Sequence, residues 1–178
     1  FRVVDPSLEG TFTDVSNHWA KDDILMATGM GLFRGMTDST FCPQMPLSRG
    51  QLVTVLYRME GSPEITGSSG FQDVAPNQYY TQAVAWAKEN GISDGSAPNG
   101  SITREQLAVM LYRASGADAG SAELSAFADS KAVSSWAAEA MSWAVEQGVI
   151  TGKKGNLLDP GGTASRAEVA VMLQRYLG

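Results

Sequence analysis

The feature that most constrains this chain is a set of motifs that recurs three times in the same order. Each copy opens with an F-x-D element and continues through an aromatic residue, a G-x-x-x-G element and an S/T-R-x-Q/E element. Each copy then closes on an apolar stretch that carries an arginine and is followed by a glycine. Tandem repetition of one unit predicts similar structural units that pack against one another.

The three copies divide the chain into repeats. The F-x-D elements begin at Phe12, Phe71 and Phe127, and the aromatic residues are Trp19, Tyr79 and Trp136. The G-x-x-x-G elements span 31–35, 91–95 and 148–152, and the S/T-R-x-Q/E elements span 48–51, 103–106 and 165–168. We expect one module over 1–178, with repeats at 11–61, 71–117 and 127–178 and polar, Gly- and Ser-rich connections between them. The second repeat has a shorter segment between its glycines and its arginine.

Hydrophobic spacing predicts two helices in each repeat. The first runs from the aromatic residue to the first glycine of G-x-x-x-G, and its large residues Trp86 and Trp143 are expected in the core. The second follows the S/T-R element, with apolar residues at i, i+3, i+4 and i+7, as in Leu52, Val55 and Leu56. Two helices cannot bury such faces alone, so an all-α fold with three units about a pseudo-threefold axis is predicted.

The S/T-R-x-Q/E element has the form of a capping box, in which two side chains satisfy backbone N–H groups at a helix start. Its arginines, Arg49, Arg104 and Arg166, stand at the first helical position, where the helix dipole disfavours a cation. One interpretation is that each arginine, with the N–H groups of the helix start, receives a carboxylate. The other is that each pairs with an F-x-D aspartate, namely Asp14, Asp73 or Asp129. The two interpretations are compatible.

The aromatic residues and glycines also have two interpretations. Trp19, Tyr79 and Trp136 either pack the start of the first helix or offer a flat face to a sugar ring, beside an aspartate that accepts hydroxyl hydrogen bonds. The second glycines of the G-x-x-x-G elements, Gly35, Gly95 and Gly152, either form a tight turn or let the backbone approach a ligand.

These motifs resemble the S-layer homology domain, here as three tandem copies that cover about residues 11–178. The resemblance implies a three-pronged helical spindle with grooves between repeats. It implies non-covalent binding of secondary cell-wall polysaccharide, often pyruvylated, on the bacterial surface. The ketal carboxylate would meet the three arginines, and the aspartate, aromatic and glycine positions would line the sugar. The second repeat departs from the pattern by Tyr79 and a shortened loop, and the first and third by Ser48 and Ser165 in place of threonine.

Composition restricts the other functions. A net charge of −6 with only 13 dispersed basic residues disfavours nucleic-acid binding. One cysteine, Cys42, and one histidine, His18, provide neither a disulfide nor a metal site, and no cofactor is expected. The three aspartates lack the dense loop of oxygen ligands that Ca²⁺ sites use. No apolar run is long enough to span a membrane.

Two other function classes compete with an anchoring module. A glycosidase would need paired carboxylates, but Asp22 with Asp23 and Glu60 with Glu64 are better explained as solvated charges, so no catalytic residue is expected. A protein-binding repeat is the remaining alternative, which differs from glycan binding in its independence of an acidic sugar. We expect an extracellular module attached to the remainder of a larger surface protein.

Overall fold

The computed structural model describes residues 6–8, 10–66, 74 and 77–178. Within this part of the chain it contains six α-helices, four short 3₁₀-helices and no β-strand, which confirms the all-α prediction. The α-helices are α1 (Lys21–Gly29), α2 (Arg49–Met59), α3 (Thr81–Glu89), α4 (Arg104–Ser115), α5 (Ala138–Glu146) and α6 (Arg166–Tyr176). The 3₁₀-helices are η1 (Pro6–Leu8), η2 (Leu124–Ala126), η3 (Ser130–Ala132) and η4 (Ser135–Ala137).

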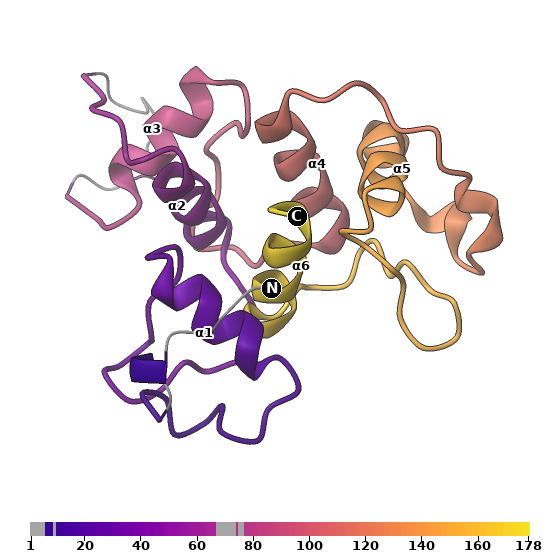
Figure 1. The fold of residues 1–178 in the computed structure, drawn as a ribbon. Helices are drawn as coiled ribbons and strands as arrows, with labels where there is room; N and C mark the ends of the chain where they lie inside the picture. The colour runs from indigo at the N-terminus through magenta and orange to yellow at the C-terminus, as the bar shows by residue number, and fades with distance from the viewer. Residues whose placement is uncertain (1–5, 9, 67–73, 75–76) are drawn as a thin grey trace.

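The helices pack in three pairs, and each pair joins two different repeats (Figure 1). Helix α2 of the first repeat packs against α3 of the second, and α4 of the second packs against α5 of the third. The series closes on itself because α6 of the third repeat packs against α1 of the first. Each prong of the spindle is therefore shared between neighbouring repeats.

A ring of three backbone hydrogen bonds marks the pseudo-threefold axis. The Ile102 N–H donates to the Leu47 carbonyl at 2.8 Å, and the Leu47 N–H donates to the Ala164 carbonyl at 2.9 Å. The Ala164 N–H completes the ring by donating to the Ile102 carbonyl at 3.1 Å. All three residues are fully buried, and each directly precedes the cap residue of α2, α4 or α6. The three long helices thus start around one common point.

The starts of α2 and α4 carry the full capping box that the S/T-R-x-Q/E element predicts, and the start of α6 carries its Ser165 half. Ser48, Thr103 and Ser165 accept hydrogen bonds from the N–H groups three residues later. The first two helical N–H groups donate to loop carbonyls of the neighbouring repeat: Arg49 to Gly100, Gly50 to Pro98, Arg104 to Gly162, Glu105 to Pro160, Arg166 to Met45 and Ala167 to Pro43, at 2.7–3.0 Å. The expectation that these N–H groups would help to hold a ligand anion is wrong, since protein carbonyls already occupy them.

The first helices end where the glycines predict. Gly31, Gly91 and Gly148 have φ values of 74°, 67° and 69°, the left-handed conformation that L side chains rarely adopt. The helices begin later than expected, two residues after the aromatic residue. Trp19 and Tyr79 lie in the preceding turn, and Trp136 lies in η4. The core includes Trp86 and Trp143, as predicted, and the apolar stripe of each second helix, except that Met59, Ala114 and Tyr176 are only partly buried.

No helix in the described residues has the length and apolar character needed to cross a lipid bilayer. The fold instead presents three inter-repeat surfaces, one beside each of α2, α4 and α6, and these surfaces carry the candidate site.

Candidate ligand grooves between repeats

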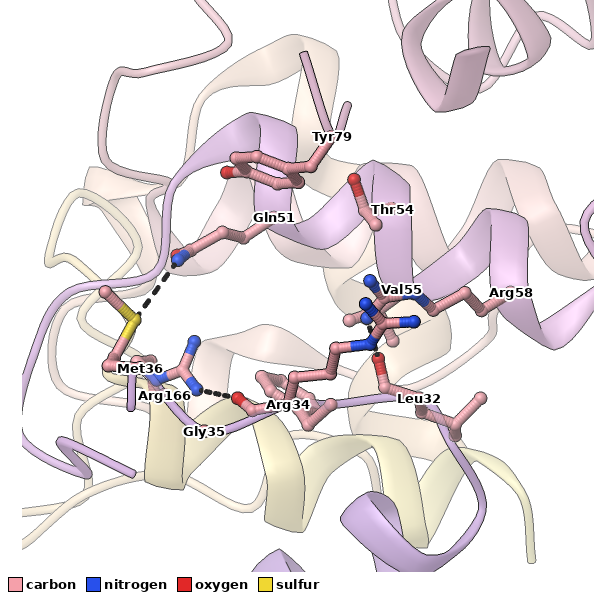
Figure 2. Close-up of a pocket in the computed structure, with 11 residues that line it drawn as sticks. Leu32, Arg34, Gly35, Met36, Gln51, Thr54, Val55, Arg58, Tyr79 and Arg166 are labelled. Carbon is pink, nitrogen blue, oxygen red and sulfur yellow. Dashed lines mark hydrogen bonds between the residues drawn. The ribbon is translucent and has the colours of Figure 1, made fainter. Parts of the chain in front are cut away.

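Three grooves related by the pseudo-threefold axis lie on the surface, with volumes of about 200, 310 and 250 Å³. Each takes its G-x-x-x-G loop and second helix from one repeat, an aromatic residue from the next, and a motif arginine from the third. We name each after its aromatic residue. Residues of the Tyr79 groove include Arg34, Gly35, Gln51, Arg58, Tyr79 and Arg166 (Figure 2). The Trp136 groove includes Arg49, Asp94, Gln106, Arg113 and Trp136. The Trp19 groove includes Trp19, Arg104, Gly152, Lys153, Glu168 and Arg175.

The three aromatic side chains face solvent. Trp19, Tyr79 and Trp136 are 67%, 58% and 59% exposed, although large aromatic side chains are usually well buried. Neighbouring rings support two of them, because His18 lies 5.4 Å from Trp19 and Tyr80 lies 5.0 Å from Tyr79, centroid to centroid. These rings are therefore not part of the core, although two of them rest on a neighbouring ring at the start of the first helix. A flat face remains open in each groove.

The motif arginines combine a groove position with a structural contact. Nε of Arg49, Arg104 and Arg166 donates to a loop carbonyl of the neighbouring repeat, respectively that of Ser96, Leu158 and Phe41, at 2.8–3.1 Å. Arg104 and Arg166 are only 3% exposed, and burial lowers the pKa of both guanidinium groups. Each arginine therefore joins two repeats as well as lining a groove.

The F-x-D aspartates hold the loops that these arginines contact. Asp14 accepts the N–H groups of Phe41 and Cys42 at 2.9 and 2.7 Å, and Asp129 accepts those of Leu158 and Asp159 at 2.8 and 2.7 Å. Phe41 and Leu158 are therefore bound from both sides, with an aspartate on the N–H and an arginine on the carbonyl.

Direct pairing of the motif arginines with these aspartates is not observed in the described residues. Neither Asp14 nor Asp129 is among the residues that line the three grooves, so their predicted contact with a sugar is not supported by their positions. Asp73 lies outside the described residues. We assign the two described aspartates a structural role.

The glycines of the site meet local steric demands. A Cβ on Gly35 would collide with the Thr37 carbonyl and with Cε1 of Phe12, while Gly95 and Gly152 have φ values of 79° and 88°. Gly35 and Gly152 line grooves, whereas Gly95 is not among the residues that line the Trp136 groove. The tight turn alone accounts for all three, and their contact with a ligand stays a prediction.

His18 and Cys42 have structural contacts. His18 Nδ1 accepts the Ala20 N–H at 3.2 Å just before α1. Cys42 is half-buried, and its N–H donates to Asp14. In the part of the chain that the structure describes, no cluster of three or more His, Cys, Asp or Glu side chains is placed to hold a metal ion.

Comparison with protein families assigns this chain to a family. The model of the S-layer homology domain matches residues 11–53, 70–108 and 126–170, which together make up most of the chain. The chain belongs to the S-layer homology domain family. Such domains are non-catalytic anchoring modules, and the relatives associate this one with the bacterial cell surface and cell wall.

Relatives include enzymes and surface-layer proteins. The chain is 31% identical, over 94% of its length, to an amylopullulanase of Thermoanaerobacterium thermosulfurigenes. It is 30% identical, also over 94%, to the exoglucanase XynX of Acetivibrio thermocellus, and 31% identical over 93% to the surface-layer 125 kDa protein of Lysinibacillus sphaericus. The S-layer homology module spans only 9%, 16% and 14% of those proteins, respectively.

Sequence reasoning did not include two sets of groove residues of this S-layer homology module among the candidate site residues. The first comprises the late arginines of the second helices, Arg58, Arg113 and Arg175. The spacing of Gln51, Val55 and Arg58 at i, i+4 and i+7 placed them on a shared helix face. The second set is the fourth residue of each G-x-x-x-G element: Arg34, Asp94 and Thr151. The charge at this position differs between the three repeats, and that difference can be seen in the sequence.

Proposed function

We propose that this module tethers a larger S-layer or other surface protein to the bacterial envelope by binding an acidic wall polysaccharide, such as a pyruvylated one, in its inter-repeat grooves. One observation carries the proposal: in every groove an exposed aromatic ring from one repeat shares the surface with arginines from two others. The binding surface exists only when all three repeats are assembled.

Each component suits a sugar bearing a carboxylate. The C–H face of a pyranose is apolar and packs on a flat ring, which explains why a large ring would be kept in water rather than in the core. A guanidinium group offers a planar fork of N–H donors that matches the two oxygens of a carboxylate. Glutamine at the third helical position, as at Gln51 and Gln106, adds a polar side chain to the groove wall.

The carboxylate pairs considered for a glycosidase do not lie in these grooves. Asp22 and Asp23 are in the first turn of α1, and Glu60 and Glu64 are exposed at and beyond the end of α2. None of the four lines a groove. Their positions support solvated charges rather than catalytic groups.

The test is isothermal titration calorimetry of this chain with purified wall polysaccharide, before and after removal of its pyruvate ketals. The variant is the triple substitution Trp19→Ala, Tyr79→Ala and Trp136→Ala, because these rings are exposed and contribute little to the core. Alanine at Arg104 or Arg166 is a poor choice, because both side chains are buried between repeats. Leu177→Ala, a partly exposed position outside the grooves, is the control.

We expect the unmodified chain and the control to bind the pyruvylated glycan, and the triple variant to lose binding while keeping its helical circular dichroism. Binding of the triple variant at full strength would contradict the proposal. A folded chain that binds neither form of the glycan would instead favour a repeat that recognises another protein.

A further inference from the structure

The three grooves share one architecture but differ in electrostatics. Among the described residues, the lining of the Tyr79 groove includes three arginines, Arg34, Arg58 and Arg166, and no Asp or Glu. The Trp136 and Trp19 grooves each include a carboxylate, Asp94 and Glu168 respectively. Binding of an anion depends on whether such a carboxylate already occupies the guanidinium donors.

In the Trp136 groove the motif arginine is already paired. Nη2 of Arg49 lies 3.0 Å from Oδ1 of Asp94. The same oxygen accepts the N–H and the hydroxyl of Ser96 at 3.0 and 2.8 Å, which fixes the carboxylate in place. These bonds from Ser96, together with Arg49, lower the pKa of Asp94, so the carboxylate stays ionised near neutral pH.

In the Trp19 groove the motif arginine is paired with a different residue, Glu168. Nη1 of Arg104 lies 3.2 Å from Oε2 of Glu168, and Nε of Arg104 donates to the Leu158 carbonyl. The groove's lysine, Lys153, lies 2.6 Å from Oδ2 of Asp159. Two of its cations therefore face carboxylates of this chain.

In the Tyr79 groove the hydrogen bonds of the motif arginine go only to backbone carbonyls among the described residues, and the Asp14 carboxylate acts on it without forming an ion pair. Nε and Nη2 of Arg166 donate to the carbonyls of Phe41 and Arg34 at 2.8 and 2.6 Å. The guanidinium carbon lies 4.4 Å from the centre of the Phe41 ring and 5.4 Å from that of Phe33. Figure 2 shows this guanidinium at the base of the cavity, below Gln51. No acceptor in the described residues pairs with its Nη1.

Two further guanidinium groups complete this cationic lining. Nη1 of Arg58 donates to the Leu32 carbonyl at 3.0 Å, and the exposed Arg34 lines the same cavity (Figure 2). Burial and then the charge of Arg34 lower the pKa of Arg58, which records the repulsion between these two cations. An anion bound between them would relieve this repulsion.

We infer that the Tyr79 groove is the site that takes a carboxylate-bearing sugar of the glycan, and that Asp94 and Glu168 occupy the place of that carboxylate in the other two grooves. The inference rests on the proposed function and adds the residues that decide which groove is used. The deciding positions are the fourth residue of G-x-x-x-G (Arg34, Asp94, Thr151) and the third helical residue (Gln51, Gln106, Glu168).

The probe for this inference is a monovalent methyl hexoside that carries a 4,6-linked pyruvate ketal, titrated by calorimetry beside the same hexoside without the ketal. We expect one tight site per wild-type chain. Arg58→Ala should weaken that site about tenfold or more, since it removes a charged hydrogen-bond donor. The same change at the equivalent positions of the other grooves, Arg113→Ala and Arg175→Ala, should weaken it far less. The control is Lys154→Ala, an exposed position outside the three grooves, which should leave it within about twofold.

A gain-of-site variant provides the complementary test. Asp94→Asn retains an oxygen that can accept from Ser96 but removes the negative charge opposite Arg49. This variant should bind a second equivalent of the pyruvylated hexoside, and Arg34→Asp should abolish the first. Thermal unfolding of each variant separates loss of binding from loss of fold.

Equal weakening by Arg58→Ala, Arg113→Ala and Arg175→Ala would overturn the inference while leaving the anchoring proposal intact, because it would show equivalent grooves. A stoichiometry unchanged by Asp94→Asn would overturn it as well. A wild-type chain that binds neither the pyruvylated hexoside nor the wall polysaccharide would defeat both proposals.

Discussion

Glu168 accepts a hydrogen bond from Nη1 of Arg104 at 3.2 Å and so links the third repeat to the second. At the equivalent position, Gln51 and Gln106 bond back to the N–H of their own cap residues and complete a capping box. The α6 start has the Ser165 half of the box without that return bond. The third repeat has therefore exchanged a local bond at the helix start for one between repeats.

The first prediction concerns this pair. Arg104→Ala should lower the free energy of unfolding by about 1–3 kcal/mol, because it removes the donor to the buried Leu158 carbonyl. Glu168→Gln should cost less, since glutamine can still accept from Arg104 or close the capping box. Urea denaturation of both single variants and the double variant measures their coupling, expected at about 0.5 kcal/mol or more. If the losses of the two single variants add up to the loss of the double variant, the two residues are not coupled and the prediction is wrong.

The second prediction separates exposed from core aromatic residues. Trp136→Ala should change the free energy of unfolding by no more than about 0.5 kcal/mol, because the ring is 59% exposed. Trp143→Ala, on the neighbouring α5, should cost about 3–5 kcal/mol, because that ring is 4% exposed. Chemical denaturation measures both. Similar losses for the two variants would show that Trp136 is retained for packing.

The third prediction is a dependence of stability on pH. Burial opposes ionisation of Asp14 and Asp129, but the N–H bonds from Phe41, Cys42, Leu158 and Asp159 outweigh it and lower both pKa values below 3.8. A lowered folded-state pKa adds stability above the unfolded-state value, and that contribution is lost as pH falls through the folded-state value. The free energy of unfolding should therefore fall as pH drops from about 5 to 2.

The double variant Asp14→Asn and Asp129→Asn is the test of that contribution, with Asp38→Asn in an exposed loop as the control. The double variant should be less stable at neutral pH and should respond less to acid than the control. If its acid response equals that of the unmodified chain, other carboxylates are responsible.

The fourth prediction concerns equivalent positions in α2 and α6. A Cβ on Gly50 would lie 2.9 Å from the Pro98 carbonyl oxygen and 3.3 Å from Cδ1 of Tyr80, so Gly50→Ala should destabilise despite the better helix propensity of alanine. At the equivalent Ala167 the side chain is accommodated, and Ala167→Gly should cost about 1 kcal/mol. Thermal melts of both variants are the measurement. Stabilisation by Gly50→Ala would show that the loop at Pro98 moves at little energetic cost to make room for the added Cβ.

The fifth prediction tests the central helices. Leu107 in α4 is fully buried, and Leu107→Ala should lower the free energy of unfolding by about 2–5 kcal/mol through lost burial and a residual cavity. Leu177→Ala, at a position that is 39% exposed, should cost far less. Denaturant titration measures the free energy of unfolding of both variants. A loss for Leu107→Ala as small as that for Leu177→Ala would mean that the core closes around the truncated side chain.

The helices and their buried faces could be predicted because both depend on local signals. The stripe that includes Leu52, Val55 and Leu56 identified the face of α2, and Gly31 marked the end of α1. The partner of each face could not be predicted, since periodicity gives the direction of a side chain but not what meets it. The packing of α1 against α6, two segments far apart in the chain, depends on tertiary contacts that the local pattern does not contain.

The site was partly predictable for the same reason. Trp19 and Arg166 stood out by recurrence, and the structure places both in grooves, though in different ones. The contacts of Asp14 and the occupation of the α6 start by the carbonyls of Pro43 and Met45 depend on backbone positions in a distant loop. A sequence shows which side chains are charged, but it does not show which backbone groups form hydrogen bonds with them.

The closed series of helix pairs has a consequence for how the protein is made. Of the six helices α1 is synthesised first, yet the helix that packs against it is α6, the last of the six. Until α6 has been made, the apolar face of α1 lacks the helix that packs against it. Contacts so distant in sequence form slowly, and the exposed apolar surface of an incomplete chain favours aggregation. Within this module the native packing of α1 therefore becomes possible only after α6 has been made.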